Sequence, residues 1–147
     1  MPKNYIKELE KLINSQKTCV IASVDAEGVP NIKGMLRPRK YTGLKTYYFS
    51  TNTSSQHVRQ FLQNPHASVY FHKRFLFYKG ILLKGTMDIL TDEDAKRMLW
   101  VKGDEKHYPG GVTDPDYCIM RFTAHSGRFY EKKKSEDFTI EDTTAQQ

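Results

Sequence analysis

Cysteine and long apolar runs are both scarce in this sequence of 147 residues. Its two cysteines, Cys19 and Cys118, each lie inside an apolar, strand-like segment with no second cysteine nearby. The spacing excludes a C-x-x-C motif, so we expect two buried free thiols. No apolar stretch approaches the length of a membrane span, and charges interrupt the N-terminal segment where a signal peptide is apolar. We therefore expect a cytoplasmic protein with no membrane partner.

A metal-ligand pattern is also missing. His66 and His72 are an even number of residues apart and share one face of a predicted strand, but no third ligand follows at a recognisable spacing. We expect no metal site. Nothing in the sequence brings Cys118 to a histidine as a nucleophile pair, and no catalytic residue is assigned.

Charge is present in excess of one sign. Lysine and arginine total 23 against 17 acidic residues, a formal net charge of +6. This balance permits nucleic acid, anionic membranes or phosphorylated small molecules as partners, and charge alone does not choose among them.

Hydrophobic periodicity predicts a mainly β chain. Residues 4–15 have the three- and four-residue spacing of an amphipathic helix, and shorter helices are expected from Val58 to Leu62 and over 92–102. Glycines at 80 and 85 suggest bends in a long strand. We expect one domain over residues 1–133, a small antiparallel barrel with peripheral helices, and a polar, structureless tail over 134–147. The predicted strands are 17–24, 29–37, 44–51, 66–73, 77–90, 117–123 and 127–132.

Six consecutive hydroxyl or amide residues, 50–55, connect one predicted strand to a short helix. One interpretation is a generous helix cap, since Ser, Thr and Asn accept hydrogen bonds from first-turn amides. The other is an anion site, because a helix N-terminus offers unpaired donors and a positive dipole end. The stretch alone leaves both open.

The order of these elements resembles the pyridoxamine 5'-phosphate oxidase-like flavoproteins, including their general stress protein-like and nitroimidazole reductase-like branches. The matching segments are "KGMLR" at 33–37 and "STNTSSQHVRQFLQNP" at 50–65, and the likeness covers roughly residues 5–132. The resemblance implies an antiparallel split β-barrel that forms a homodimer and binds FMN at the subunit interface.

The resemblance also implies the cofactor-binding residues. Lys33, in place of the family's usual Arg, is expected to meet the cofactor first and Arg37 second, while Arg39 and Lys40 are expected at the surface. Gln56 and His57 stand where many members have Arg or Lys, so fixed positive charge is missing there. The full expected set is Lys33, Gly34, Met35, Leu36, Arg37, Ser50, Thr51, Ser55, Gln56 and His57.

By resemblance, the expected function is an FMN-dependent oxidoreductase that passes electrons from a nicotinamide donor through flavin to a small-molecule acceptor. The family's pyridoxal phosphate-binding Arg and His pattern is not evident, so pyridoxamine phosphate oxidation itself is not expected. Two alternatives stand beside it: a split barrel that binds deazaflavin or haem, and a non-enzymatic basic barrel that stacks single-stranded nucleic acid on its aromatic strands. Nucleic acid is the less favoured partner.

Overall fold

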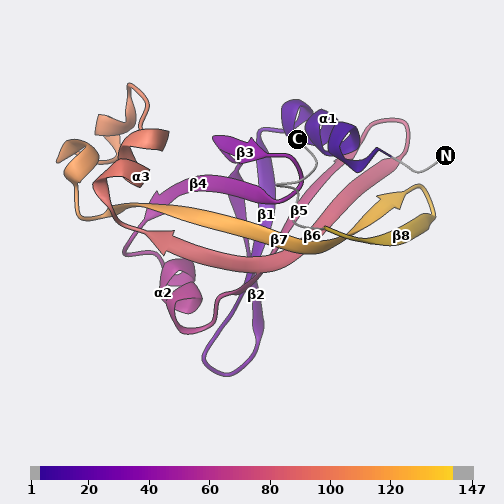
Figure 1. Ribbon diagram of the computed structural model, residues 1–147, viewed down its shortest axis with the longest axis horizontal. Coiled ribbons are helices and arrows are strands. Elements are labelled where there is room, and N and C mark those ends of the chain that lie inside the picture. The colour runs from indigo at the N-terminus through magenta and orange to yellow at the C-terminus, as the bar shows by residue number, and fades with distance from the viewer. Residues whose placement is uncertain (1–3, 141–147) are drawn as a thin grey trace.

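The chain folds into an eight-stranded antiparallel sheet with three α-helices around it, as the computed structural model of residues 4–140 shows (Figure 1). The strands follow the order β2-β1-β5-β6-β7-β4-β3, and β8 pairs with β7 off this path. No helix among residues 4–140 is long and apolar enough to cross a membrane. The architecture agrees with the expected antiparallel barrel with peripheral helices.

The N-terminal third forms a helix and a hairpin. Helix α1 (Tyr5–Ser15) begins after Asn4, whose side chain accepts a hydrogen bond from the Lys7 amide. Strands β1 (Thr18–Val24) and β2 (Pro30–Leu36) pair antiparallel through a turn in which Gly28 has φ +81°. Glycine is favoured there because a Cβ atom is strained at positive φ. Strand β1 alternates buried and half-buried residues, whereas β2 is an edge strand and mostly exposed.

Strand β4 (Thr46–Asn52) and helix α2 (Gln56–Gln63) flank the hydroxyl run, and the short strand β3 (Lys40–Thr42), which the sequence analysis did not anticipate, pairs with β4. Strands β5 (His66–Arg74) and β6 (Tyr78–Leu90) follow as a long hairpin. The register of β6 against β7 shifts between Lys84 and Gly85, and a Cβ at Gly85 would lie 1.9 Å from the Thr123 carbonyl oxygen. The glycine at 85 therefore marks a bulge where two backbones approach, as expected.

Helix α3 (Glu93–Leu99) is shorter than the expected 92–102. Asp92 caps it, because the Asp92 carboxylate accepts a hydrogen bond from the Ala95 amide. The segment after α3 contains two 3-10 turns, η1 (Asp104–Lys106) and η2 (Gly111–Thr113). Trp100 packs edge-on against Tyr117 in a second apolar cluster, separate from the main core.

Two expectations for the C-terminal part were wrong. Residues 117–132 do not form a two-stranded hairpin, because β7 (Tyr117–Glu131) is one continuous strand of 15 residues. The tail does not lose structure at residue 134, because β8 (Lys134–Thr139) pairs with β7. Phe138 anchors β8 by stacking on Tyr5 at 4.2 Å between ring centroids. The rest of the expected tail, residues 141–147, lies outside the described residues.

Candidate functional site

Two adjoining cavities lie beside β2. The first, which we call the strand cavity, has a volume of about 440 Å³ and is lined by residues of β2, β4 and the η1 turn. The second, the helix cavity, has a volume of about 230 Å³ and lies between β1, β2 and the start of α2. Lys33 lines both cavities, so its side chain stands at the point where they meet.

The structure gathers nine of the ten expected residues on these two cavities. Lys33 and the next four residues of the sequence, together with Ser50 and Thr51, line the strand cavity. Gln56 and His57 line the helix cavity with Lys33. Ser55 lies at the N-cap position of α2. Segments that are about 20 residues apart in the chain are therefore brought together by the pairing of β1 with β2 and by the position of α2 against β1.

His57 is buried at the start of α2 and is held by two hydroxyls. Its Nε2 atom lies 2.9 Å from Thr51 Oγ1 and 3.1 Å from Ser55 Oγ. Burial, and second the positive charge of Lys33, lower the pKa of His57 to about 4. His57 is therefore neutral at pH 7 and contributes hydrogen bonds, not charge, so Lys33 is the charged side chain at the helix cavity.

The hydroxyl run does not act as a helix cap. The Ser55 side chain makes no capping hydrogen bond to the first turn of α2, and its hydroxyl donates to the Asn52 carbonyl oxygen at 2.7 Å instead. The amides at the start of α2 thus keep their donors directed beyond the helix end. The Asp116 carboxylate accepts from the Asn52 side chain at 2.9 Å and from the Ser54 amide at 2.8 Å, so part of the run is already bound within the protein and the anion site stays a prediction.

Gly34 has open space above it, whereas the Arg37 side chain is hydrogen-bonded to α1. A Cβ atom added at Gly34 would meet nothing within 4 Å, so the space over this residue is open to a flat ligand. The Arg37 guanidinium donates to the carbonyl oxygens of Ile13 at 3.2 Å and Asn14 at 3.3 Å. Arg37 lines the strand cavity while binding the C-terminal turn of α1, where unpaired carbonyls favour a cation.

The η1 turn is the part of the site that sequence reasoning missed. Arg39, expected at the surface, forms a two-bond ion pair with buried Asp104, with distances of 2.6 and 2.8 Å. The guanidinium also donates to the Leu99 carbonyl oxygen at 2.9 Å. The Arg39 hydrogen bond holds the pKa of the Asp104 carboxyl below its usual range. This pair closes one side of the strand cavity, and no local sequence signal joins two residues 65 positions apart.

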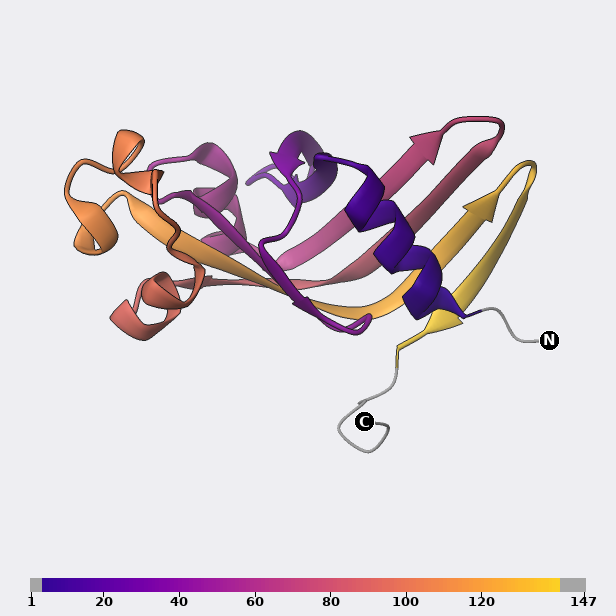
Figure 2. The ribbon, with the colours of Figure 1, turned by 90° about the horizontal axis from the view of Figure 1, so that it is seen from above.

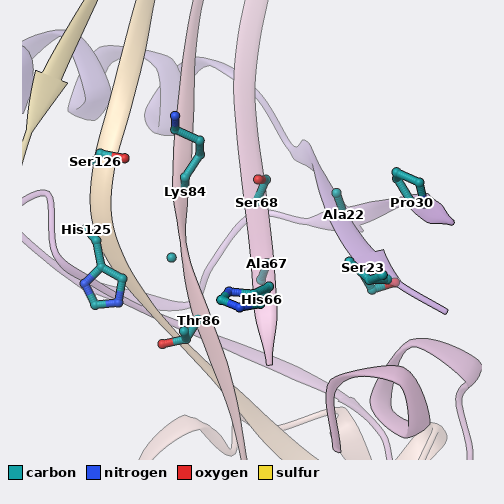
Figure 3. Close-up of a pocket in the computed structure, with 12 residues that line it drawn as sticks. Ala22, Ser23, Pro30, His66, Ala67, Ser68, Lys84, Thr86, His125 and Ser126 are labelled. Atoms are coloured by element: carbon teal, nitrogen blue, oxygen red, sulfur yellow. The ribbon is translucent and has the colours of Figure 1, made fainter. Parts of the chain in front are cut away.

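A third hollow lies on the other side of β1 and shares Ser23 of that strand with the helix cavity (Figure 3). Its volume is about 670 Å³, and its lining includes His66 and His125 on either side of Thr86. His66 and His72 share the outer face of β5, and no cluster of three or more metal-ligating side chains occurs within the described part of the chain.

Comparison with protein families finds one match: the family described as pyridoxamine 5'-phosphate oxidase matches residues 5–131. A pyridoxine/pyridoxamine 5'-phosphate oxidase of Rhizobium meliloti (strain 1021) is 32% identical over 92 residues, which are 62% of this chain and 43% of that protein. The corresponding protein of Agrobacterium fabrum is 31% identical over 83 residues, 56% of this chain and 39% of that protein. The matched region thus spans less than half the length of these curated relatives.

Solved structures extend the likeness to nearly the whole chain. A protein from Clostridium acetobutylicum, related to general stress protein 26 of B. subtilis and assigned to the pyridoxinephosphate oxidase family, is 37% identical with a TM-score of 0.83. The match covers 95% of this chain and 97% of that one. A haem-binding protein from Mycobacterium smegmatis has a TM-score of 0.73 at 13% identity, covering 95% of this chain and 59% of that one. The second likeness shows the fold alone.

Proposed function

Because this chain belongs to the pyridoxamine 5'-phosphate oxidase family, we propose that it is an FMN-binding oxidoreductase whose cofactor site is formed by the strand and helix cavities. Curated relatives named as pyridoxine/pyridoxamine 5'-phosphate oxidases support an oxidoreductase in general terms. The finer assignment to FMN rests on the geometry around Lys33.

Lys33 is the observation that carries the proposal. Its side chain lines both cavities, and its positive charge helps to lower the pKa of buried His57 at the start of α2. A phosphate there would meet a lysine and the amides of a helix N-terminus, which together form a usual anion site. The Lys33 ammonium would supply the charge that neutral Gln56 and His57 do not.

The remaining residues suit the flat and polar parts of a flavin. Open space over Gly34 admits a ring against the backbone of β2, and Met35 is a half-buried apolar contact beside it. Ser50 and Thr51 offer hydroxyls on the opposite wall of the strand cavity. When bound, the flavin supplies the electron-transfer chemistry, and the side chains described here bind and orient it. We propose a nicotinamide electron donor and a small-molecule acceptor.

We also propose that two copies of the chain form the working unit. Strand β2 is an edge strand, and its Ile32, beside the helix cavity, and Leu36, beside the strand cavity, are 76% and 71% exposed. Apolar side chains at this exposure on a sheet edge are typical of a protein interface. A second copy would cover them and complete the wall of the site. Light scattering of the purified protein measures whether the mass is that of a dimer.

Lys33→Met tests the cofactor site directly. We expect FMN binding to weaken by roughly 1.5–3 kcal/mol, the range for a hydrogen bond to a charged group, with riboflavin affinity almost unaltered. Titration of ligand-free protein with FMN and with riboflavin measures both affinities. Lys40→Met is the matched control, because Lys40 is an exposed lysine on β3 that lines neither cavity. If neither ligand's affinity changes in Lys33→Met, β2 does not form the flavin site.

The absorbance spectrum of the purified protein separates this function from its rivals. A flavin spectrum supports the proposal. A deazaflavin absorbance band would mean that the cofactor is a deazaflavin and not FMN. Haem is the second candidate, because His66 and His125 line the third hollow and imidazole is a common axial ligand of haem iron. A Soret band that disappears in His66→Ala or His125→Ala would assign haem to that hollow. Excess absorbance from co-purified nucleic acid would instead indicate a nucleic-acid-binding barrel.

A further inference from the structure

The turn between β5 and β6 has an unusual composition for a hairpin. Arg74 pairs with Tyr78, so the turn consists of Phe75, Leu76 and Phe77. Their exposed fractions are 87%, 84% and 39%. Three-residue hairpin turns are normally built from glycine and polar residues, which tolerate water and the turn's backbone angles. Two large apolar side chains are therefore held in solvent at the outermost point of the hairpin.

The neighbouring turn between β7 and β8 is unusual in a different way. Glu131 pairs with Lys134, so Lys132 and Lys133 form the turn and three lysines follow one another. Lys132 has φ +56°, a conformation that favours glycine or asparagine. The turn therefore has a lysine at a position where the uncharged residues glycine and asparagine adopt the backbone conformation more readily.

These two turns lie together at one end of the molecule (Figure 2). The Lys132 amide donates to the Tyr78 carbonyl oxygen at 2.9 Å, and the Lys132 ammonium lies 5.0 Å from the centre of the Phe77 ring. The Lys79 ammonium lies 5.5 Å from the same ring. Two cations therefore cover Phe77, while Phe75 and Leu76 project beyond them.

Basic residues outnumber acidic ones around this tip. The acidic side chains on or beside the two turns are Glu8, which pairs with Lys79 at 3.2 Å, Glu131 and Glu136. The basic residues number twice as many, and within residues 4–140 Lys79 is the one that forms an ion pair, while Glu131 makes a further contact of its own. The six basic residues are Lys73, Arg74, Lys79, Lys132, Lys133 and Lys134.

We propose that this tip, formed by residues 73–79 and 131–135, docks the protein on the surface of an anionic phospholipid bilayer. Phe75 and Leu76 enter between the headgroups, and the surrounding lysines contact lipid phosphates. A bilayer interface provides both chemistries at the required places, with an apolar layer beneath a negatively charged one. An apolar patch without basic residues would be expected to bind another protein, and a basic patch without apolar residues would bind any polyanion. The tip combines both kinds of residue. This docking is peripheral and concerns a surface distant from the two cavities beside β2.

Sedimentation of the full chain with phospholipid vesicles tests the proposal. We expect the protein to sediment with vesicles of equal parts phosphatidylglycerol and phosphatidylcholine, and to stay in solution with phosphatidylcholine alone. The double variant Phe75→Ser, Leu76→Ser should lower the partition coefficient roughly tenfold or more, since it removes the apolar contact. Lys133→Gln should lower it roughly fivefold, the effect of one basic residue at an anionic surface.

Matched variants at other places separate docking from general charge attraction. Leu62→Ser removes an exposed leucine on α2, and the double variant Lys102→Gln, Lys106→Gln removes charge near the η1 turn. Both should bind vesicles as the wild type does. Equal loss in the Lys102 and Lys106 variant, or an unchanged partition coefficient in the Phe75 and Leu76 variant, overturns the proposal.

A second copy of the chain is the main competing occupant of the tip. If Phe75→Ser, Leu76→Ser weakens a dimer and leaves vesicle binding unchanged, the tip is a subunit contact and the proposal is wrong. Phe75→Trp gives an independent readout when the emission of the wild type, which comes from Trp100, is subtracted. The difference emission should shift to shorter wavelength when phosphatidylglycerol vesicles are added to the full-length variant, and an unshifted difference spectrum contradicts insertion.

Discussion

The two ends of the molecule differ in how their charged side chains are placed. Near α3 and the η1 turn, which lie at one end of the molecule (Figure 1), Arg39 forms an ion pair with buried Asp104, and the charge of Lys33 helps to lower the pKa of neutral His57 at the start of α2. At the end with the β5–β6 and β7–β8 turns, lysines cover an aromatic ring and apolar side chains face solvent. The Arg39–Asp104 pair and His57 form parts of cavity walls. The turn lysines and apolar side chains of the tip are exposed and can contact another surface. Inward charge thus indicates a binding site, and outward charge around an apolar tip indicates a docking surface.

Breaking the inward ion pair should have the largest effect on stability. Asp104→Ala leaves the Arg39 guanidinium, 29% exposed, without its carboxylate and removes an acceptor of the Val101 amide. We expect the free energy of unfolding to fall by roughly 1.5–3 kcal/mol, the range for charged hydrogen bonds, because Asp104 is buried while water reaches Arg39. Urea denaturation measures the change.

An ion pair at the tip end is the matched control. Arg128 donates to Asp137 at 2.7 Å, and both side chains are well exposed. Asp137→Ala should leave the denaturation midpoint within experimental error, because water already screens this pair. If the two alanine variants are equally destabilised, the contrast between inward and outward charge does not hold.

The pH dependence of the unfolding free energy should show a smaller effect, which arises from His57. His57 has a pKa of about 4 in the folded chain against an ordinary value of 6.5. Between these values the unfolded chain binds a proton that the folded chain does not, so stability falls as pH drops from 6.5 towards 4. We expect His57 to contribute on the order of 2 kcal/mol of this fall.

Substitution of His57 also removes its two contacts with hydroxyl groups, which changes the stability at every pH. The variants are therefore compared by the slope of unfolding free energy against pH. His57→Gln should flatten the dependence of unfolding free energy on pH over this range, measured by urea denaturation at several pH values. His72→Gln changes an exposed histidine and should leave the slope as it is in the wild type. Identical slopes in His57→Gln and the wild type would mean that His57 is not buried neutral.

The smallest effect on stability is expected at the tip itself. Phe75→Ser, Leu76→Ser changes two side chains that are more than four-fifths exposed, so little apolar contact is lost on substitution. The melting temperature should stay within about 2 °C of the wild type. A large decrease would show that the two residues already pack against a protein surface in solution.

Local sequence signals predicted most of the strands, one turn and one bulge. The alternation in β1 and β5, the positive φ of Gly28 and the bulge at Gly85 all follow from the residue types at those positions. Strand β8 was missed because five of its six residues are polar, and its position depends on Phe138 stacking on Tyr5 more than 130 residues away. A periodicity argument cannot detect one distant anchor.

The site was predictable only where local pattern and family resemblance agreed. Lys33, Ser50 and Thr51, which the resemblance assigned to the cofactor, line one cavity together, and their contact with a cofactor stays a prediction. Arg39 was placed at the surface because a basic residue beside an edge strand is usually solvated, and its partner Asp104 lies in a turn whose position depends on the tertiary fold. Long-range ion pairs of this kind require the structure.

Strand β7 has a consequence for the synthesis of the protein. It pairs with β6 along most of its length and with β4 near its start, so residues 46–52, which pair with β3 on one side, gain their second sheet neighbour only from residues 117–123. A chain growing from the ribosome cannot close this sheet until β7 has emerged. Until then β4 and β6 each keep one edge unpaired, and those edges are the parts of the nascent sheet that are open to pairing with other chains.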